Sequence, residues 1–206
     1  MTIGNLRPAT VLIDETAILH NVQHEVARLK KQTQLFAVVK ADAYGHGMLR
    51  VAHVAKAAGA SGFCVALLDE ALDLRAANYT EPVLVLGIVP SQYAAIAAAQ
   101  TVSLPLSSVD WLKQALPVLE AQPELPPLRL HIALDTGMGR IGFTDDQTLL
   151  DAVAFIQAHP KAFTIEGIFT HFATADDPDD AYFKQQVAKF NHMVALLPHR
   201  PRYVHV

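Results

Sequence analysis

The sequence predicts an α/β fold, specifically a (β/α)8 TIM-type barrel that is incomplete in this chain. Short apolar segments alternate with amphipathic helical segments along the 206 residues, and the connections between them are short, which is typical of parallel βαβ units. Counting these units gives about six strands and the start of a seventh, whereas a closed barrel needs eight strands. We therefore expect one incomplete barrel domain over residues 1–206.

Apolar spacing and cap residues place the elements of the first half. A helix capped by Asp14 keeps Ile18, Val22 and Leu29 on one face, and Gly59 ends a later helix. We expect extended segments at 10–13, 35–39, 63–67 and 83–86, and helices at 14–29, at 46–58, after a cap at Asp69, and at 92–99.

The second half follows the same alternation. Thr144 and Gln147 have the spacing of a capping box, and Pro198 stops the last helix, which carries Phe183, Val187, Phe190, Val194 and Leu197 on one face. We expect strands at 102–104, 128–134 and 164–169 and from 202 onward, with helices at 108–116, 144–156 and 183–197.

Composition narrows the possible classes of protein. About half of the residues are hydrophobic and the net charge is -4, which suits one large core and argues against nucleic-acid binding, since that depends on neutralising several phosphates. No apolar run approaches the roughly 20 residues that cross a bilayer, and Asn5, Arg7 and Pro8 interrupt the place of a signal peptide. We therefore expect a cytoplasmic protein without membrane or metal, in which the single Cys64 is a core residue.

Lys40 is the first candidate for chemistry. It ends an apolar segment and enters the loop of AVVKADAYGHG, which leads directly into a helix. A lysine closing a strand is usually a surface charge. An amine held beside an apolar strand is poorly hydrated, however, which favours the nucleophilic neutral form needed for a Schiff base with an aldehyde. Tyr44 can meet the same ligand from the loop.

Arg140 and His171 are the next candidates, because each follows a different expected strand. In a parallel barrel, residues just past the carboxyl ends of the strands converge on one face, so these side chains can share a pocket with Lys40. The guanidinium fork of Arg140 suits a carboxylate or a phenolate oxygen. The alternatives are an ordinary surface ion pair for Arg140 and a structural role for His171.

Gly137–Gly142 also satisfies the pattern G-x-G-x-x-G of dinucleotide-binding proteins. In that fingerprint the helix opens within the glycines and the turn belongs to the first βα unit. Here the expected helix cap lies beyond the last glycine, and the unit is a late one. We therefore reject a dinucleotide-dependent oxidoreductase.

Three motifs in order resemble the alanine racemase family, and the resemblance runs from about Ala9 to Val206. They are KADAYGHG around Lys40, DTGMGRIG at Asp135–Gly142, and THFATAD at Thr170–Asp176. The resemblance implies a pyridoxal 5'-phosphate enzyme, an isomerase that interconverts L-alanine and D-alanine for peptidoglycan synthesis. It implies a homodimer for the full-length protein.

The resemblance also implies a role for each candidate. Lys40 would hold the cofactor covalently and act as the base on the α-carbon of the D-isomer. Tyr44 would bind the cofactor phosphate, and His171 would lie beside the pyridine ring. Arg140 would bind the substrate carboxylate and the phenolic oxygen of the cofactor.

Two departures from the family pattern qualify these expectations. Many members carry a carbamylated lysine at the position of Ala133, where it steadies the following arginine, and here only a methyl group is present. Family members also continue beyond the position of Val206 into a C-terminal β-domain whose tyrosine is the second base. We therefore expect these 206 residues alone to be inactive or nearly so, and a non-catalytic fragment that binds pyridoxal phosphate is the alternative.

Overall fold

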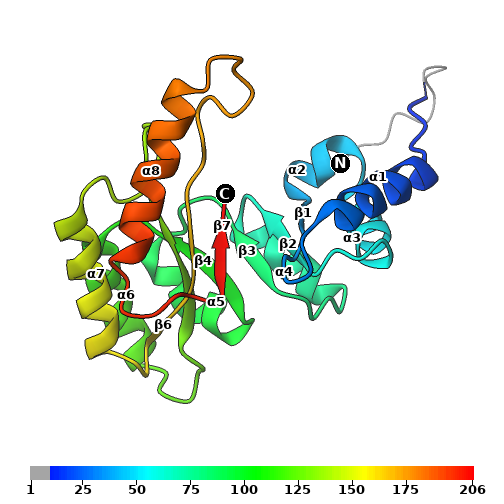
Figure 1. Ribbon diagram of the computed structural model, residues 1–206. Coiled ribbons are helices and arrows are strands. Elements are labelled where there is room, and N and C mark those ends of the chain that lie inside the picture. Colours follow the sequence, from blue (N-terminus) through cyan, green and yellow to red (C-terminus); the bar gives the residue numbers. More distant parts are fainter. Residues whose placement is uncertain (1–9) are drawn as a thin grey trace. The chain divides into compact units, whose positions relative to one another are not determined.

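The computed structural model describes residues 10–206 and divides the chain into two compact units, Met1–Phe63 and Cys64–Val206. Seven strands of the described residues are ordered β1 to β7 in the sheet, the same order as in the sequence. Helices lie between consecutive strands (Figure 1). This succession confirms the α/β class and the partial TIM-type barrel.

The first unit contains α1 (Glu15–Arg28), β1 (Phe36–Val38), α2 (Lys40–Gly45) and α3 (Met48–Ala57). Asp14 caps α1 as predicted, because its carboxylate accepts hydrogen bonds from the backbone of Thr16 and Ala17. Helices α1 and α3 pack together, and an ion pair of 3.1 Å joins Glu15 and Arg50. The segment 10–13 is not a strand, so that expectation is wrong.

The second unit is built on parallel strand pairs that position the loops following each strand. The strands are β2 (Gly62–Val65, which begins in the first unit), β3 (Val83–Val85), β4 (Val102–Leu106), β5 (Leu128–Ala133), β6 (Phe163–Phe169) and β7 (Tyr203–His205). Pairing is parallel from β3 through β7. Strands β2, β3 and β4 are buried along their whole length. This is why β2 and β3 read as continuous apolar runs, whereas Ser103 interrupts the run of β4.

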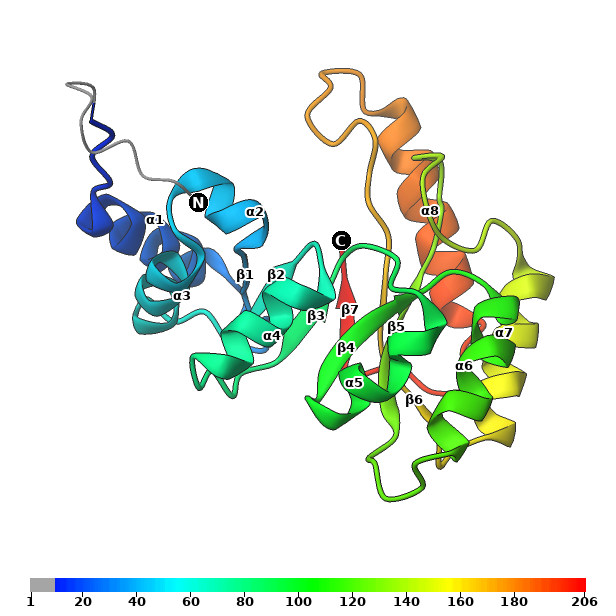
Figure 2. The same cartoon turned by 180° about the vertical axis from the view of Figure 1, so that it is seen from behind.

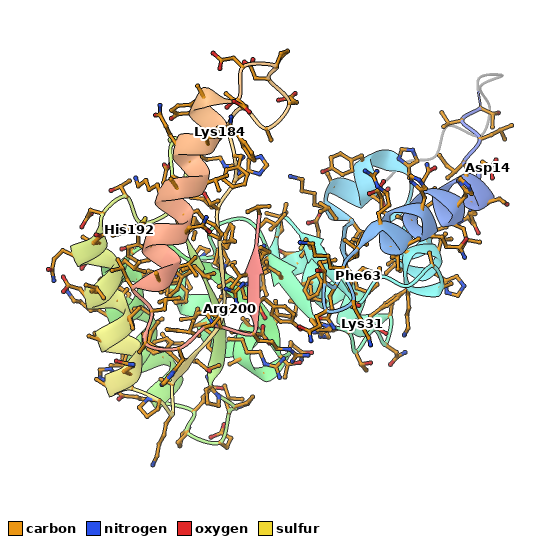
Figure 3. All side chains as sticks on the ribbon, in the orientation of Figure 1. Asp14, Lys31, Phe63, Lys184, His192 and Arg200 are labelled. Atoms are coloured by element: carbon orange, nitrogen blue, oxygen red, sulfur yellow. The ribbon has the colours of Figure 1, made fainter. Side chains whose placement is uncertain are left out.

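Helices of the second unit are α4 (Leu68–Ala76), α5 (Ala94–Ala99), α6 (Val109–Glu120), α7 (Asp146–Ala158) and α8 (Ala181–Ala195), with a 3-10 turn η1 (Ser91–Tyr93) before α5. Helices α6 and α7 lie side by side in both views (Figures 1 and 2). His192, labelled on α8 in Figure 3, lies 2.7 Å from the carboxylate of Asp146 at the start of α7. None of the helices within residues 10–206 has the length and apolar character needed to cross a membrane.

Two predicted helix caps are wrong. Asp69 lies inside α4, and the carboxylate of Glu70 instead accepts the backbone N–H groups of Ala66 and Leu67 at 2.7 and 3.1 Å. Thr144 precedes the true cap of α7, which is Asp145. Helix α4 begins earlier than predicted, after Leu67, so Glu70 lies within its first turn, whereas α7 begins later than predicted, after Asp145.

Candidate active site

Lys40 lies two residues beyond the last residue of β1, as predicted. Val39 before it is fully buried, whereas Lys40 itself is half-buried. The strand therefore anchors the backbone of Lys40 while the amine remains accessible.

The chain after Lys40 makes a left-handed helical turn instead of an ordinary loop. Ala41, Asp42, Ala43 and Tyr44 all have φ between 51° and 56°. Each non-glycine residue in this conformation costs about 1–2 kcal/mol, and such strain accumulates at functional sites when the surrounding structure holds it. The strained residues 41–44 are therefore a candidate part of a functional site.

Hydrogen bonds hold this left-handed turn in place. The N–H of Ala43 donates to Val39 at 2.9 Å, and the N–H of Gly47 donates to the carbonyl of Asp42 at 2.9 Å. The carboxylate of Asp42 also accepts the N–H of Met48 at 2.8 Å, where α3 begins. Asp42 thus joins the turn to the following helix.

The turn brings Lys40 and Tyr44 together. The Nζ atom of Lys40 lies 6.0 Å from the centroid of the Tyr44 ring, and the Tyr44 side chain is 64% exposed. An amine and a phenolic hydroxyl are therefore available on one accessible surface of the first unit.

Arg140 lies in the second unit on a tightly bonded loop after β5, Asp135–Gly142, which we call the arginine loop. The Asp135 carboxylate accepts the N–H groups of Gly137, Gly139 and Arg140 at 2.9, 3.0 and 3.1 Å. Partial burial raises the pKa of Asp135, but these three donors outweigh it, so that the pKa lies below its usual 3.8. An ionised carboxylate thus fixes the backbone that carries Arg140.

Replacing Gly142 by alanine is expected to destabilise the arginine loop severely. Gly142 has a φ of 124°, and an added Cβ would overlap the backbone of Asp135 and Leu134. We expect a loss of about 3 kcal/mol or more in the free energy of unfolding, measured by urea denaturation. The matched control is Gly139→Ala, where φ is 70° and the space is open, with an expected loss of only about 1 kcal/mol. Equal losses in the two variants would contradict this account of the loop.

His171 follows β6 on a neighbouring loop, Thr170–Ala175, which we call the histidine loop, and its side chain is exposed. Buried hydroxyl groups join the two loops: Thr136 and Thr170 lie 2.8 Å apart, and Thr170 donates to the carbonyl of Leu134 at 2.8 Å. The structure therefore places Arg140 and His171 on two loops that are directly bonded to each other.

The backbone of the glycine-rich segment Gly137–Gly142 does not have the geometry of a dinucleotide-binding turn. Gly137, Gly139 and Gly142 all have positive φ within the arginine loop, and α7 begins only at Asp146. A helix N-terminus therefore does not open among the glycines, as the dinucleotide fingerprint requires. Ala133 is buried at the end of β5, so its methyl group leaves the positioning of Arg140 to the hydrogen bonds of the loop.

A buried polar cluster inside the sheet escaped the sequence analysis. Nε2 of His131 lies 3.3 Å from the carboxylate of Glu166, which also accepts the hydroxyl of Ser103, and Nδ1 of His131 lies 2.8 Å from Nε2 of His205. Gly167 makes room for it, because a Cβ there would overlap the His131 ring. The sequence could have indicated this cluster, because each of these polar residues interrupts an apolar strand.

Burial and hydrogen bonding shift the pKa values of two members of this cluster, Glu166 and His205. Burial raises the pKa of Glu166, but hydrogen bonds from His131 and Ser103 outweigh it, and the pKa lies below the usual 4.5. Burial, together with the neighbouring His131, lowers the pKa of His205 from 6.5 to about 3. At neutral pH the cluster therefore contains a carboxylate and an uncharged His205.

Cys64 is buried as predicted, and burial raises the pKa of its thiol to about 12.

Known proteins resemble this chain over its full length. The alanine racemase from Lacticaseibacillus casei is 85% identical over 206 residues, which are 100% of this chain and 54% of the relative. The crystal structure of alanine racemase from E. faecalis matches with a TM-score of 0.94 at 48% identity, covering 100% of this chain and 55% of that one. The histidine racemase from Leuconostoc mesenteroides matches with a TM-score of 0.84 at 35% identity, covering 93% and 50% of the two chains.

Family membership follows from the extent of the match. The chain spans about half the length of the curated relatives it matches. The profile of the alanine racemase N-terminal domain matches residues 13–206, nearly the whole chain. With the strand order and the motif-bearing loops described above, this match shows that the chain belongs to the alanine racemase N-terminal domain family.

Proposed function

We propose that this chain is the N-terminal part of the barrel domain of a pyridoxal-phosphate-dependent alanine racemase, which interconverts L-alanine and D-alanine for peptidoglycan synthesis in the cytoplasm. One observation carries the proposal: Lys40, the lysine of the family motif, lies two residues beyond β1 and is held with Tyr44 on a strained turn. Support for alanine as substrate comes from the 85% identical relative, an alanine racemase.

The donor groups fit pyridoxal phosphate chemically. Lys40 offers a primary amine for the aldehyde, and Tyr44 offers an exposed hydroxyl for the phosphate. Arg140 offers a guanidinium for a carboxylate or phenolate oxygen, and His171 offers a flat ring that can lie beside the pyridine. When bound, pyridoxal phosphate supplies the electron sink that stabilises the charge left on the α-carbon by loss of its proton.

Lys40 is the residue we propose to move a proton. Its Nζ atom would remove the α-proton of the D-isomer and return a proton to the same face in the reverse direction. Arg140 would bind the substrate carboxylate through its guanidinium fork. The exposed side chain of Tyr44, 6.0 Å from the same amine, would hold the cofactor at its phosphate end.

Racemisation also needs a second base on the opposite face of the substrate. In the family that this chain resembles, the second base is a tyrosine from the C-terminal β-domain of the partner subunit. We therefore propose a homodimer for the full-length protein. A chain that lacks that tyrosine would bind cofactor and substrate but exchange protons on one face only.

The test is conversion of L-alanine to D-alanine by the purified full-length protein with added pyridoxal phosphate, followed by chiral chromatography. We expect conversion of alanine in both directions and little or none with histidine as substrate. Growth of a D-alanine auxotroph is expected with the full-length protein and not with residues 1–206 alone. Binding of pyridoxal phosphate without any racemisation by the full-length protein would favour the non-catalytic alternative, and preferential conversion of histidine would overturn the assignment of alanine.

A further inference from the structure

Helix α8 presents three side chains along one face to the arginine loop. Tyr182, Gln186 and Lys189 are spaced by four and three residues, so they lie in a row on the helix. The Tyr182 hydroxyl donates to the carbonyl of Gly137 at 2.8 Å, and Nζ of Lys189 donates to the carbonyl of Asp135 at 3.0 Å. Between them, Nε2 of Gln186 donates to the hydroxyl of Thr136 at 3.4 Å. We call these three side chains the α8 row.

Gln186 also reaches the histidine loop. Its Oε1 accepts the N–H of Ala173 at 3.0 Å, two residues beyond His171. The Gln186 side chain is fully buried, although glutamine is usually exposed. A single buried amide therefore bonds to both loops that carry candidate site residues.

Hydrogen bonds run from Gln186 through the hydroxyls of Thr136 and Thr170 to the carbonyl of Leu134, and each has a defined donor. The Thr170 hydroxyl donates to the carbonyl of Leu134, so it can only accept from Thr136. The Thr136 hydroxyl therefore accepts from the Gln186 amide. The path needs a donor on one end of residue 186 and an acceptor on the other, and glutamine supplies both.

We propose that the α8 row is a positioning device, with Gln186 as its central residue, that holds Arg140 and His171 in a fixed relation to each other. This inference rests on the proposed function for the ligands of those two side chains. Lys189 holds the backbone of Asp135, and the Asp135 carboxylate holds the N–H of Arg140, so the row acts on Arg140 through two bonded steps.

The decisive variant is Gln186→Glu, studied in the full-length protein. Glutamate keeps the shape and the acceptor for Ala173, but its carboxylate cannot donate to Thr136. The matched control is Gln185→Glu, the same chemical change at the neighbouring exposed position of α8. Amide hydrogen exchange, measured without and with pyridoxal phosphate, reports the loops directly. Steady-state kinetics with alanine as substrate show how a loosening of the two loops changes KM and kcat.

We expect Gln186→Glu to speed exchange at Gly139, Arg140 and Ala173 together by about tenfold or more relative to Gln185→Glu. The KM for alanine should rise more than kcat falls, with kcat/KM lowered by roughly tenfold to a hundredfold. Cofactor attachment at Lys40 should be retained. Exchange that stays unchanged, or that rises in one loop only, would overturn the proposal.

Tyr182→Phe keeps the proposal testable if Gln186→Glu does not fold, because it removes only a hydroxyl on the exposed part of the row. Exchange should then rise at Gly139 and Arg140 and stay unchanged at Ala173. The opposite pattern, or no change, would contradict the assignment. The exchange measurement does not depend on catalysis. Failure of the proposed function would appear separately, as absence of racemisation in the Gln185→Glu control.

Discussion

Lys40→Ala is expected to abolish covalent attachment of pyridoxal phosphate to the full-length protein and to lower racemase activity by about a thousandfold or more. The amine of Lys40 lies at the end of β1 beside the Tyr44 ring. Removing it takes away both the group that binds the aldehyde and the proposed base. Borohydride reduction followed by peptide mapping locates the attachment, and absorbance spectroscopy follows its loss.

The control for this experiment is Lys31→Ala, an exposed lysine of the same unit that is labelled in Figure 3. It should retain the reduced adduct on Lys40 and the activity of the unmodified sequence. Recovery of the adduct on a different residue, or an unchanged absorbance band in Lys40→Ala, would refute the lysine assignment and with it the proposed reaction.

The turn after Lys40 shows where sequence reasoning reaches its limit. The position of Lys40 after a strand could be predicted, because a short apolar run followed by glycines is a strong local signal. The left-handed conformation of four consecutive non-glycine residues could not. Local preference opposes it most strongly at the two alanines and the tyrosine, and hydrogen bonds such as that from the N–H of Met48 to the carboxylate of Asp42 hold it.

Strand positions were predicted well for a simple physical reason. Strands buried on both faces are usually continuous apolar runs, so β2 and β3 could be predicted without knowledge of the strands they pair with. The caps predicted at Asp69 and Thr144 are wrong because several oxygen-bearing side chains lie close together in each place, and α4 begins after Leu67 and α7 after Asp145. Choosing between them requires the exact end of the preceding segment, which local sequence does not determine.

Gln186 illustrates a further class of residue that a single sequence hides. A glutamine in a helix is ordinarily a solvent-exposed residue, and its neighbour Gln185 is one. Gln186 differs only in facing two loops that arrive from β5 and β6, and these are distant in sequence. Its role therefore depends on tertiary contacts and became visible only in the structure.

The stability of the protein is expected to fall as the pH drops from about 6.5 toward 4.5, because of His205. Its pKa is about 3 in the folded protein and near 6.5 in the unfolded chain. The unfolded chain therefore takes up a proton in this range, whereas the folded protein does not. One such group lowers the free energy of unfolding by up to about 1.4 kcal/mol for each pH unit.

Carboxylates with a lowered pKa act in the same direction but at lower pH. Asp135 and Glu166 have pKa values below their usual 3.8 and 4.5, so they stabilise the fold while ionised and lose that contribution only as the pH falls below those values. The interval between pH 6.5 and 4.5 therefore separates the contribution of His205 from those of these two carboxylates.

His205→Gln tests this assignment, because a glutamine amide offers both a donor and an acceptor to Nδ1 of His131 but does not titrate. Urea unfolding of the cofactor-free full-length protein at pH 7, 6 and 5 should show a steep decline for the unmodified sequence and a shallower one for His205→Gln. His199→Gln, a change at an exposed histidine, should keep the steep decline. If His205→Gln declined as steeply as His199→Gln, the proton taken up on unfolding would belong to another group, and His205 would not be the neutral end of the buried chain that begins at Glu166.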